Sequence, residues 1–159
     1  MGNRAVITSK DKKSGLYLHW NGGRDSVNAF LTYCKLQGYR GFGEDNTYAL
    51  ARLTQVVCNW FGGSLSVGVG AIGDYYKEEV KDEVYGDYVR EGYKGELDCN
   101  NYDNGLYIVD GWDIVGREFF EGKEQNTYDL KYFIYDINLK QPESMQLTNE
   151  EIENYFKED

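Results

Sequence analysis

The chain is organised around the stretch Leu16-Tyr17-Leu18-His19-Trp20-Asn21-Gly22-Gly23-Arg24-Asp25-Ser26-Val27. Apolar side chains alternate along residues 16–20, which predicts a strand with Leu16, Leu18 and Trp20 on one face. The two glycines then break the strand, because glycine adopts backbone conformations that are closed to other residues. Asp25 or Ser26 is expected to cap the following helix by accepting hydrogen bonds from its first free N–H groups.

Two amphipathic helices are predicted from this point onward. The first spans about residues 26–37, and the second follows a cap at residues 45–47 and ends at Gly62-Gly63. Apolar residues recur every three or four positions in both, so each helix presents one apolar stripe to a shared core. The stripes are Val27, Phe30, Leu31 and Cys34 in the first helix, and Leu50, Leu53, Val57, Trp60 and Phe61 in the second.

Short strands are predicted on either side of the helices. Residues 4–8 form a hairpin with residues 16–20, and residues 64–69 alternate Leu65, Val67 and Val69 with small residues. Residues 106–109 and 112–115 flank Asp110-Gly111, which is a strong hairpin turn, and Gly116 allows a bulge. Short turns between neighbouring strands favour antiparallel pairing.

The C-terminal part leaves one choice open. Over residues 128–138 the spacing of Leu130, Phe133, Ile134 and Ile137 favours a helix, while the aromatic and β-branched content favours a strand. A helix is the preferred interpretation, and the capping box at residues 148–151 predicts a short terminal helix. We therefore expect a single α+β domain over residues 1–159. Its mostly antiparallel sheet packs against two amphipathic helices, with an acidic insertion at about residues 73–96 and a short C-terminal helix.

The composition argues against several protein classes. The 159 residues fit one domain and contain no apolar run near the ~20 residues of a membrane span. One histidine and three cysteines without Cys-x-x-Cys spacing do not match a structural zinc site. Cys34, Cys58 and Cys99 are expected to be small buried thiols. We expect a cytoplasmic protein without a metal or another cofactor.

The net charge of −10 is concentrated in two segments. Residues 74–104 carry ten acids and four bases, and residues 141–159 carry six acids and one base. An acidic surface repels phosphate backbones, which argues against direct nucleic-acid binding. It favours a basic partner protein, including one that itself handles nucleic acid.

The acidic segment at about residues 73–96 is also rich in tyrosine, and it is compatible with a short exposed helix or with an irregular extension. Acids interleaved with tyrosines can present negative charge in place of phosphates, while the tyrosines add contact area at low entropic cost. The alternative is a surface that only aids solubility. The candidate partner-binding residues are Tyr75, Tyr76, Glu78, Glu79, Asp82, Glu83, Asp87 and Tyr88.

The opening stretch offers a second kind of site. A glycine turn at a helix N-terminus attracts anions, because free N–H groups and the helix dipole converge there. The candidate anion-binding residues are His19, Gly22, Gly23, Arg24 and Ser26. The turn matches neither a Walker loop nor a GxGxxG motif, and the alternative is a tight turn in which Arg24 pairs with a nearby acid. No recognisable nucleophile accompanies His19, so we expect no catalytic residue and no enzyme.

Three strings carry a resemblance: Gly2-Asn3-Arg4-Ala5-Val6-Ile7-Thr8, residues 16–27 and residues 97–107. They resemble small acidic proteins of phages, plasmids and integrative elements of Gram-positive bacteria, over most of the chain apart from about residues 71–95. The resemblance brings no established activity and assigns no residue a role. It implies a mobile-element context inside a bacterial host, where small acidic proteins are often similar in role to anti-restriction or anti-CRISPR inhibitors.

These observations predict a non-enzymatic inhibitor or interaction protein. It would present its acidic, tyrosine-rich face, as a mimic of nucleic acid, to a basic host protein such as a CRISPR or restriction nuclease. The alternative function is a domain that binds or sequesters an anionic small molecule or nucleotide at the Gly22-Gly23-Arg24 turn.

Overall fold

The computed structural model describes residues 2–72, 79–81, 88–90, 97–124 and 129–157. It has the expected α+β architecture. The strands are β1 (Ala5–Ser9), β2 (Ser14–Leu18), β3 (Val67–Ala71), β4 (Glu79–Lys81), β5 (Tyr88–Arg90), β6 (Leu106–Asp110) and β7 (Asp113–Glu118). The helices are α1 (Arg24–Leu36), α2 (Asn46–Phe61), α3 (Leu130–Leu139) and α4 (Asn149–Lys157), with a short 3-10 turn at Glu143–Met145.

The main sheet has five strands in the order β3-β2-β1-β6-β7. The two predicted hairpins are present, since β1–β2 and β6–β7 both pair antiparallel. The β1–β6 pair is parallel, so the sheet is mixed. This pairing places β1 in the centre, where all five of its residues are buried.

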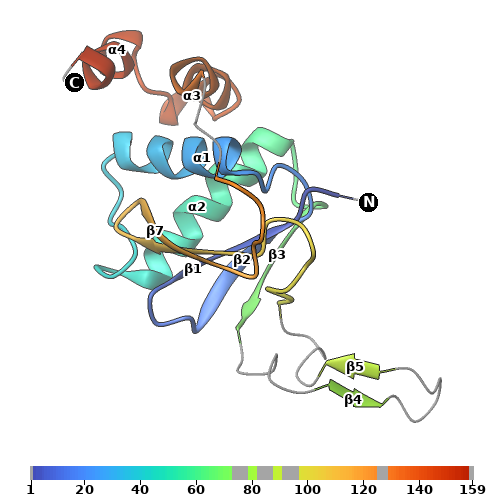
Figure 1. The fold of residues 1–159 in the computed structure, drawn as a ribbon. Helices are drawn as coiled ribbons and strands as arrows, with labels where there is room; N and C mark the ends of the chain where they lie inside the picture. Colours follow the sequence, from blue (N-terminus) through green and yellow to red (C-terminus); the bar gives the residue numbers. More distant parts are fainter. Residues whose placement is uncertain (1, 73–78, 82–87, 91–96, 125–128, 158–159) are drawn as a thin grey trace.

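The molecule is built in layers (Figure 1). Helices α1 and α2 pack against the sheet, and α3 and α4 lie on the far side of α1. Helix α1 is consequently buried well beyond its predicted stripe, including the whole run of residues 29–34. On the opposite face of the sheet, Val6 and Leu106 pack with Cys99 of the loop that precedes β6.

The open choice at residues 128–138 is resolved in favour of a helix, which is α3. Ile134 and Ile137 are fully buried, because α3 packs onto α1. Asn138 is also buried, and its side-chain oxygen accepts hydrogen bonds from the Tyr33 hydroxyl (2.6 Å) and the Leu147 N–H (2.8 Å). Its side-chain amide donates to the Leu147 carbonyl (2.9 Å). The predicted capping box is confirmed, since the side chains of Thr148 and Glu151 each bond the other's backbone N–H.

Two boundaries around the glycine turn differ from the prediction. Strand β2 ends at Leu18, so Trp20 lies outside the strand, and it is 47% exposed. The N-cap of α1 is Gly23, so the predicted caps Asp25 and Ser26 lie inside the first helical turn. The helix begins early because Gly22 donates its N–H to the Asn3 carbonyl (2.8 Å), which brings the chain back against the start of β1.

Two strand predictions are also corrected. The β6–β7 turn is centred on Gly111 and Trp112, because the Trp112 ring is buried against Phe42 and its N–H donates to the Tyr39 carbonyl. Strand β3 begins at Val67, and Leu65 is fully exposed because it lies beyond the end of the β2–β3 ladder. The second helix is as predicted, with Asp45 as its N-cap and Gly62 in a left-handed conformation at its C-cap.

The acidic insertion contributes its own two-stranded antiparallel sheet, β4–β5 (Figure 1). Strand pairing at residues 79–81 and 88–90 replaces the helix or irregular extension expected there. Among the described residues, no helix is long and apolar enough to cross a membrane. Cys34 and Cys99 are buried as expected, whereas Cys58 is only partly buried.

Candidate functional site

The glycine turn is held between the residues that lead into β1 and strand β6. A side chain at Gly22 would place its Cβ 2.5 Å from the Asn3 carbonyl oxygen, so only glycine fits this close approach. The Gly22 carbonyl accepts a hydrogen bond from the Tyr107 hydroxyl of β6 (2.7 Å). The N-terminus of α1 is therefore fixed beside the end of the β6–β7 hairpin.

A pocket of about 470 Å³ opens where these elements meet. We call it the arginine pocket, and the lining residues that matter here are Gly23, Arg24, Tyr107, Arg117, Phe120 and Glu124. It combines the N-terminus of α1 with side chains of β6, β7 and the segment after β7. Lys123 and Asp25 also line it, so its charged side chains sum to a net charge of +1 in a protein of net charge −10.

Arg117 contacts rings, a backbone carbonyl and a carboxylate in the arginine pocket. It lies opposite Tyr107 in the β6–β7 ladder, and its guanidinium carbon is 3.8 Å from the Tyr107 ring centroid and 3.9 Å from that of Phe120. Its side chain is 12% exposed, and one terminal nitrogen donates to the Asn104 carbonyl (2.7 Å). Stacking between two rings fixes the plane of the guanidinium. Its Nε is buried without a hydrogen-bond partner among the described residues.

Glu124 lies between the two arginines. One carboxylate oxygen pairs with Arg24 (Nη1–Oε2, 3.3 Å), and the other pairs with Nη1 of Arg117. The alternative prediction that Arg24 pairs with a nearby acid is therefore correct. The Asp25 carboxylate is engaged within its own turn, where it accepts a hydrogen bond from the Ser26 N–H (2.8 Å).

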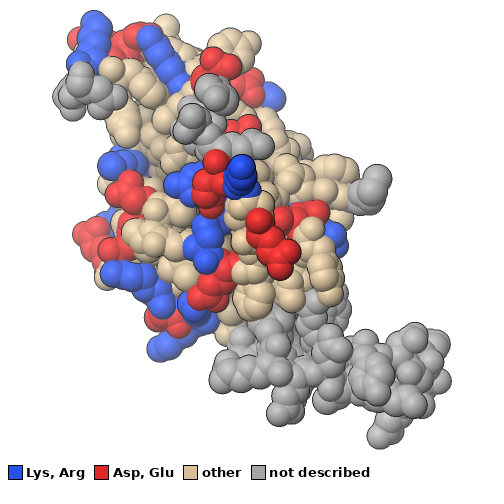
Figure 2. Space-filling view, viewed as in Figure 1, with Lys and Arg blue, Asp and Glu red and all other residues tan. Residues whose placement is uncertain are grey.

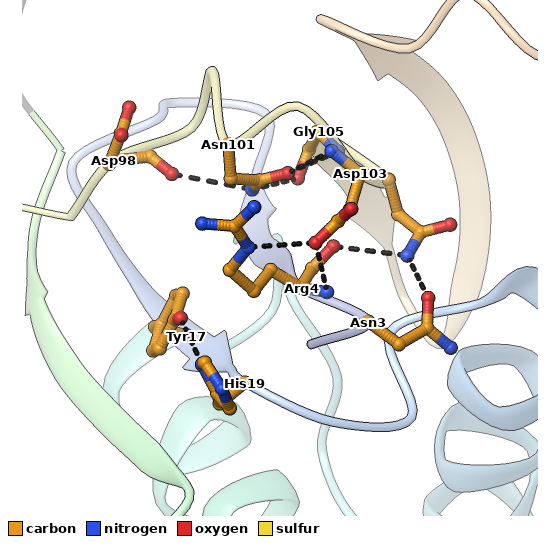
Figure 3. Close-up of polar contacts among 9 residues, drawn as sticks. Asn3, Arg4, Tyr17, His19, Asp98, Asn101, Asp103 and Gly105 are labelled. Carbon is orange, nitrogen blue, oxygen red and sulfur yellow. Dashed lines mark hydrogen bonds and ion pairs between the residues drawn. The ribbon is translucent and has the colours of Figure 1, made fainter. Parts of the chain in front are cut away.

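The predicted anion-site residues are only partly brought together. Gly23 and Arg24 line the arginine pocket, whereas His19, Gly22 and Ser26 do not. Ser26 is buried, and its hydroxyl accepts a hydrogen bond from the Asn21 side chain (3.3 Å). His19 lies after the end of β2, with its Nδ1 2.9 Å from the Tyr17 hydroxyl (Figure 3).

A polar network supports the pocket from the side of β1 (Figure 3). The Asp103 carboxylate accepts hydrogen bonds from the Arg4 side chain (2.7 Å) and the Arg4 backbone N–H (3.1 Å). Partial burial opposes ionisation of Asp103, but these bonds outweigh it and hold the pKa of Asp103 below its ordinary value. Asn104 donates to Asn3 and to the Arg4 carbonyl, which positions the backbone carbonyl that receives Arg117.

A second hollow of about 530 Å³ adjoins the first, with Gly122 lining both. Tyr102, Asp103, Phe119 and Glu121 also line it. Tyr102 and Phe119 have positive φ angles of 64° and 58°, an uncommon conformation for bulky residues. Gly105 allows the backbone at the end of β7 to approach closely, because a Cβ there would lie 2.2 Å from the Glu118 carbonyl oxygen.

Most of the predicted partner-binding residues lie outside the described residues. Those outside are Tyr75, Tyr76, Glu78, Asp82, Glu83 and Asp87. Glu79 and Tyr88 lie on β4 and β5, and only their backbone is described. On the face drawn in Figure 2, the basic and acidic side chains of the described residues lie interspersed.

Arg117, Phe120 and Glu124 are among the pocket residues that sequence reasoning missed. A signal was present, because the run Arg117-Glu118-Phe119-Phe120 comes directly after the predicted bulge at Gly116. The arrangement directs two guanidinium groups at one carboxylate, in a pocket that the N-terminus of α1 also lines, and this is the chemistry of an anion site. Within the part of the chain that the structure describes, no group of three or more His, Cys, Asp or Glu side chains is placed to hold a metal ion. Comparisons of the chain with protein-family models, with curated proteins and with solved structures find no match.

Proposed function

We propose that this protein binds a small anionic ligand, bearing a phosphate or carboxylate group, in the arginine pocket. One observation carries the proposal: Arg24 and Arg117 both direct a terminal nitrogen at the same carboxylate, that of Glu124. The position between them therefore favours negative charge, and charge-assisted bonds from arginine are among the stronger hydrogen bonds in proteins.

The first supporting feature is preorganisation. Arg117 is held flat between Tyr107 and Phe120 before any ligand arrives, so little side-chain freedom is lost on binding. The thirteen-residue helix α1 adds its N-terminus, where the N-cap Gly23 supplies no side-chain cap and Asp25 bonds the Ser26 N–H.

The second supporting feature is the size of the pocket. A volume of about 470 Å³ lies in the ordinary range for small-molecule sites. A net charge of −10 disfavours a long polyanion such as nucleic acid, because repulsion grows with each phosphate that approaches the protein. A small anion experiences mainly the local positive charge of the pocket.

Titration calorimetry with inorganic phosphate and pyrophosphate tests the proposal. We expect Arg117→Lys to weaken binding at least about tenfold, because lysine keeps the charge but loses the planar stack and the forked donors. Arg40→Lys is the matched control, since Arg40 also stacks on a ring (4.4 Å from the Tyr48 centroid) and does not line the pocket. Binding that is unchanged in Arg117→Lys, or lost equally in Arg40→Lys, would contradict the proposal.

The acidic segment supports a second proposal, an inhibitor of a basic, nucleic-acid-handling protein in the cytoplasm of a bacterial host. Its support is the charge of residues 74–104, with ten acids against four bases, together with the resemblance to mobile-element proteins. Charge mimicry requires binding that weakens steeply as salt rises. A quadruple variant that neutralises Glu78, Glu79, Asp82 and Glu83 is expected to lose the complex, and retained binding would reject this proposal.

A further inference from the structure

Glu124 forms a double ion pair, and an inference drawn from it rests on the proposed function of the arginine pocket. One carboxylate oxygen of Glu124 pairs with the guanidinium of Arg24, and the other pairs with that of Arg117. These are the contacts that the acid group of a bound ligand would make. The free protein thus already contains an anion at its anion site.

An intramolecular carboxylate competes strongly with a carboxylate from solution. The Glu124 side chain is tethered to the same chain, and such tethering gives effective concentrations on the order of millimolar. A free carboxylate offers the two arginines the same two oxygens and the same single charge. It gains no new contact by displacing Glu124, so its apparent affinity is reduced by the full strength of the internal pairing.

A phosphate monoester differs in both charge and geometry. It carries a charge of roughly −1.5 to −2 at neutral pH and three acceptor oxygens. It can therefore engage both guanidinium groups and still offer a third oxygen to another donor that lines the pocket. Lys123, which also lines the pocket, lies next to Glu124 in the sequence and adds positive charge at the same place.

Glu124 is also placed where it can leave. Its side chain is 40% exposed, compared with 12% for Arg117. Displacing it would return the carboxylate to water, which readily solvates a side chain that is already partly exposed. Arg117 would stay in position through its ring contacts and its bond to the Asn104 carbonyl.

We infer that Glu124 is a specificity-determining residue: an internal carboxylate that excludes carboxylate ligands from the arginine pocket and yields to phosphate dianions. The ligand class is accordingly a small phosphate monoester. Binding is coupled to release of Glu124 from both arginines.

Titration calorimetry of the full chain with inorganic phosphate and with acetate tests the inference. The wild type is expected to bind phosphate at least about tenfold more tightly than acetate, and Glu124→Gln to bind phosphate about tenfold more tightly than the wild type does. The ratio between phosphate and acetate should narrow in Glu124→Gln, because the competing charge is gone. Glu124→Asp keeps the charge on a shorter side chain, so its affinity for phosphate should lie between those of the wild type and Glu124→Gln.

Glu121→Gln is the matched control, because Glu121 is a nearby carboxylate of the same segment that lines only the neighbouring hollow. Equal gains in phosphate affinity for Glu121→Gln and Glu124→Gln would show that only net charge matters and would overturn the inference. Equal phosphate affinity in the wild type and Glu124→Gln would overturn it as well. Both of these results leave the proposed function intact. Phosphate binding by Glu124→Gln alone would support both ideas, and absence of binding by every folded variant would overturn both.

Discussion

Two polar networks in this protein are built on opposite principles. Between α1 and α3, the neutral network of Tyr33, Asn138 and the Leu147 backbone is buried, and each of its hydrogen bonds joins uncharged groups. At the arginine pocket, the network of Arg24, Arg117 and Glu124 is charged and partly exposed, and Arg117 Nε has no partner within the described residues. The first arrangement is suited to stability and the second to exchange of partners.

The largest loss of stability is expected from a substitution of Asn138 in the neutral network. Asn138→Ala should lower the free energy of unfolding by about 3 kcal/mol, because it leaves the buried N–H and C=O of Leu147 without their bonds. Urea unfolding provides the measurement. A loss below about 1 kcal/mol would mean that water replaces the side chain, and the neutral network would then not be a principal stabilising element.

Alkaline pH should weaken the same network. Burial raises the pKa of Tyr33 to about 12, so the folded state resists an ionisation that the unfolded chain undergoes near pH 10. The stabilisation is complete below pH 10 and is lost as pH rises toward 12, by on the order of 2–3 kcal/mol. Between pH 8 and 12, the free energy of unfolding should fall less steeply in Tyr33→Phe than in the wild type. Identical slopes for the two proteins would mean that ionisation of Tyr33 does not cause the loss of stability at alkaline pH.

Acid should act on the charged side of the molecule. The bonds from Arg4 hold the pKa of Asp103 below its ordinary value, so its contribution is present above about pH 4 and is lost as pH falls through the lowered pKa. Asp103→Asn should flatten the stability profile below pH 4 and cost about 1 kcal/mol at pH 7. An unaltered acid limb in Asp103→Asn would show that other carboxylates control acid unfolding.

The smallest expected change in stability belongs to Arg24. Its pair with Glu124 is partly exposed, so Arg24→Ala should alter the free energy of unfolding by about 0.5 kcal/mol or less. Phosphate binding should nevertheless weaken about tenfold, since one of two guanidinium groups is removed. Parallel urea and calorimetric measurements separate these effects. A large stability loss without a binding loss would place Arg24 with the structural residues.

Sequence reasoning succeeded where the signal is local. The second helix was bounded correctly because Asp45 caps its start and Gly62 adopts the left-handed conformation at its end. The capping box at Thr148 and the helical spacing around Ile134 were equally informative. Each of these depends on residues within a few positions of one another, which a single sequence displays directly.

The arginine pocket depended on contacts that no local pattern contains. Arg24 and Arg117 come together only because β6 pairs parallel with β1, and that pairing joins distant parts of the chain. Arg117 faces Tyr107 only because Trp112 is drawn into the core, which shifts the turn and places a bulge in β7. A register counted from Asp110-Gly111 puts another residue opposite Tyr107, so the stacked arginine was missed.

The central position of β1 also has a consequence for folding kinetics. Strands β1, β2 and β3 can pair as soon as the first 71 residues exist, but the second edge of β1 waits for β6, which begins at Leu106. Closing that long loop is an entropic barrier, and non-local pairing of this kind slows folding. Until it closes, the most buried strand of the native sheet is an open edge, available to any other strand it meets.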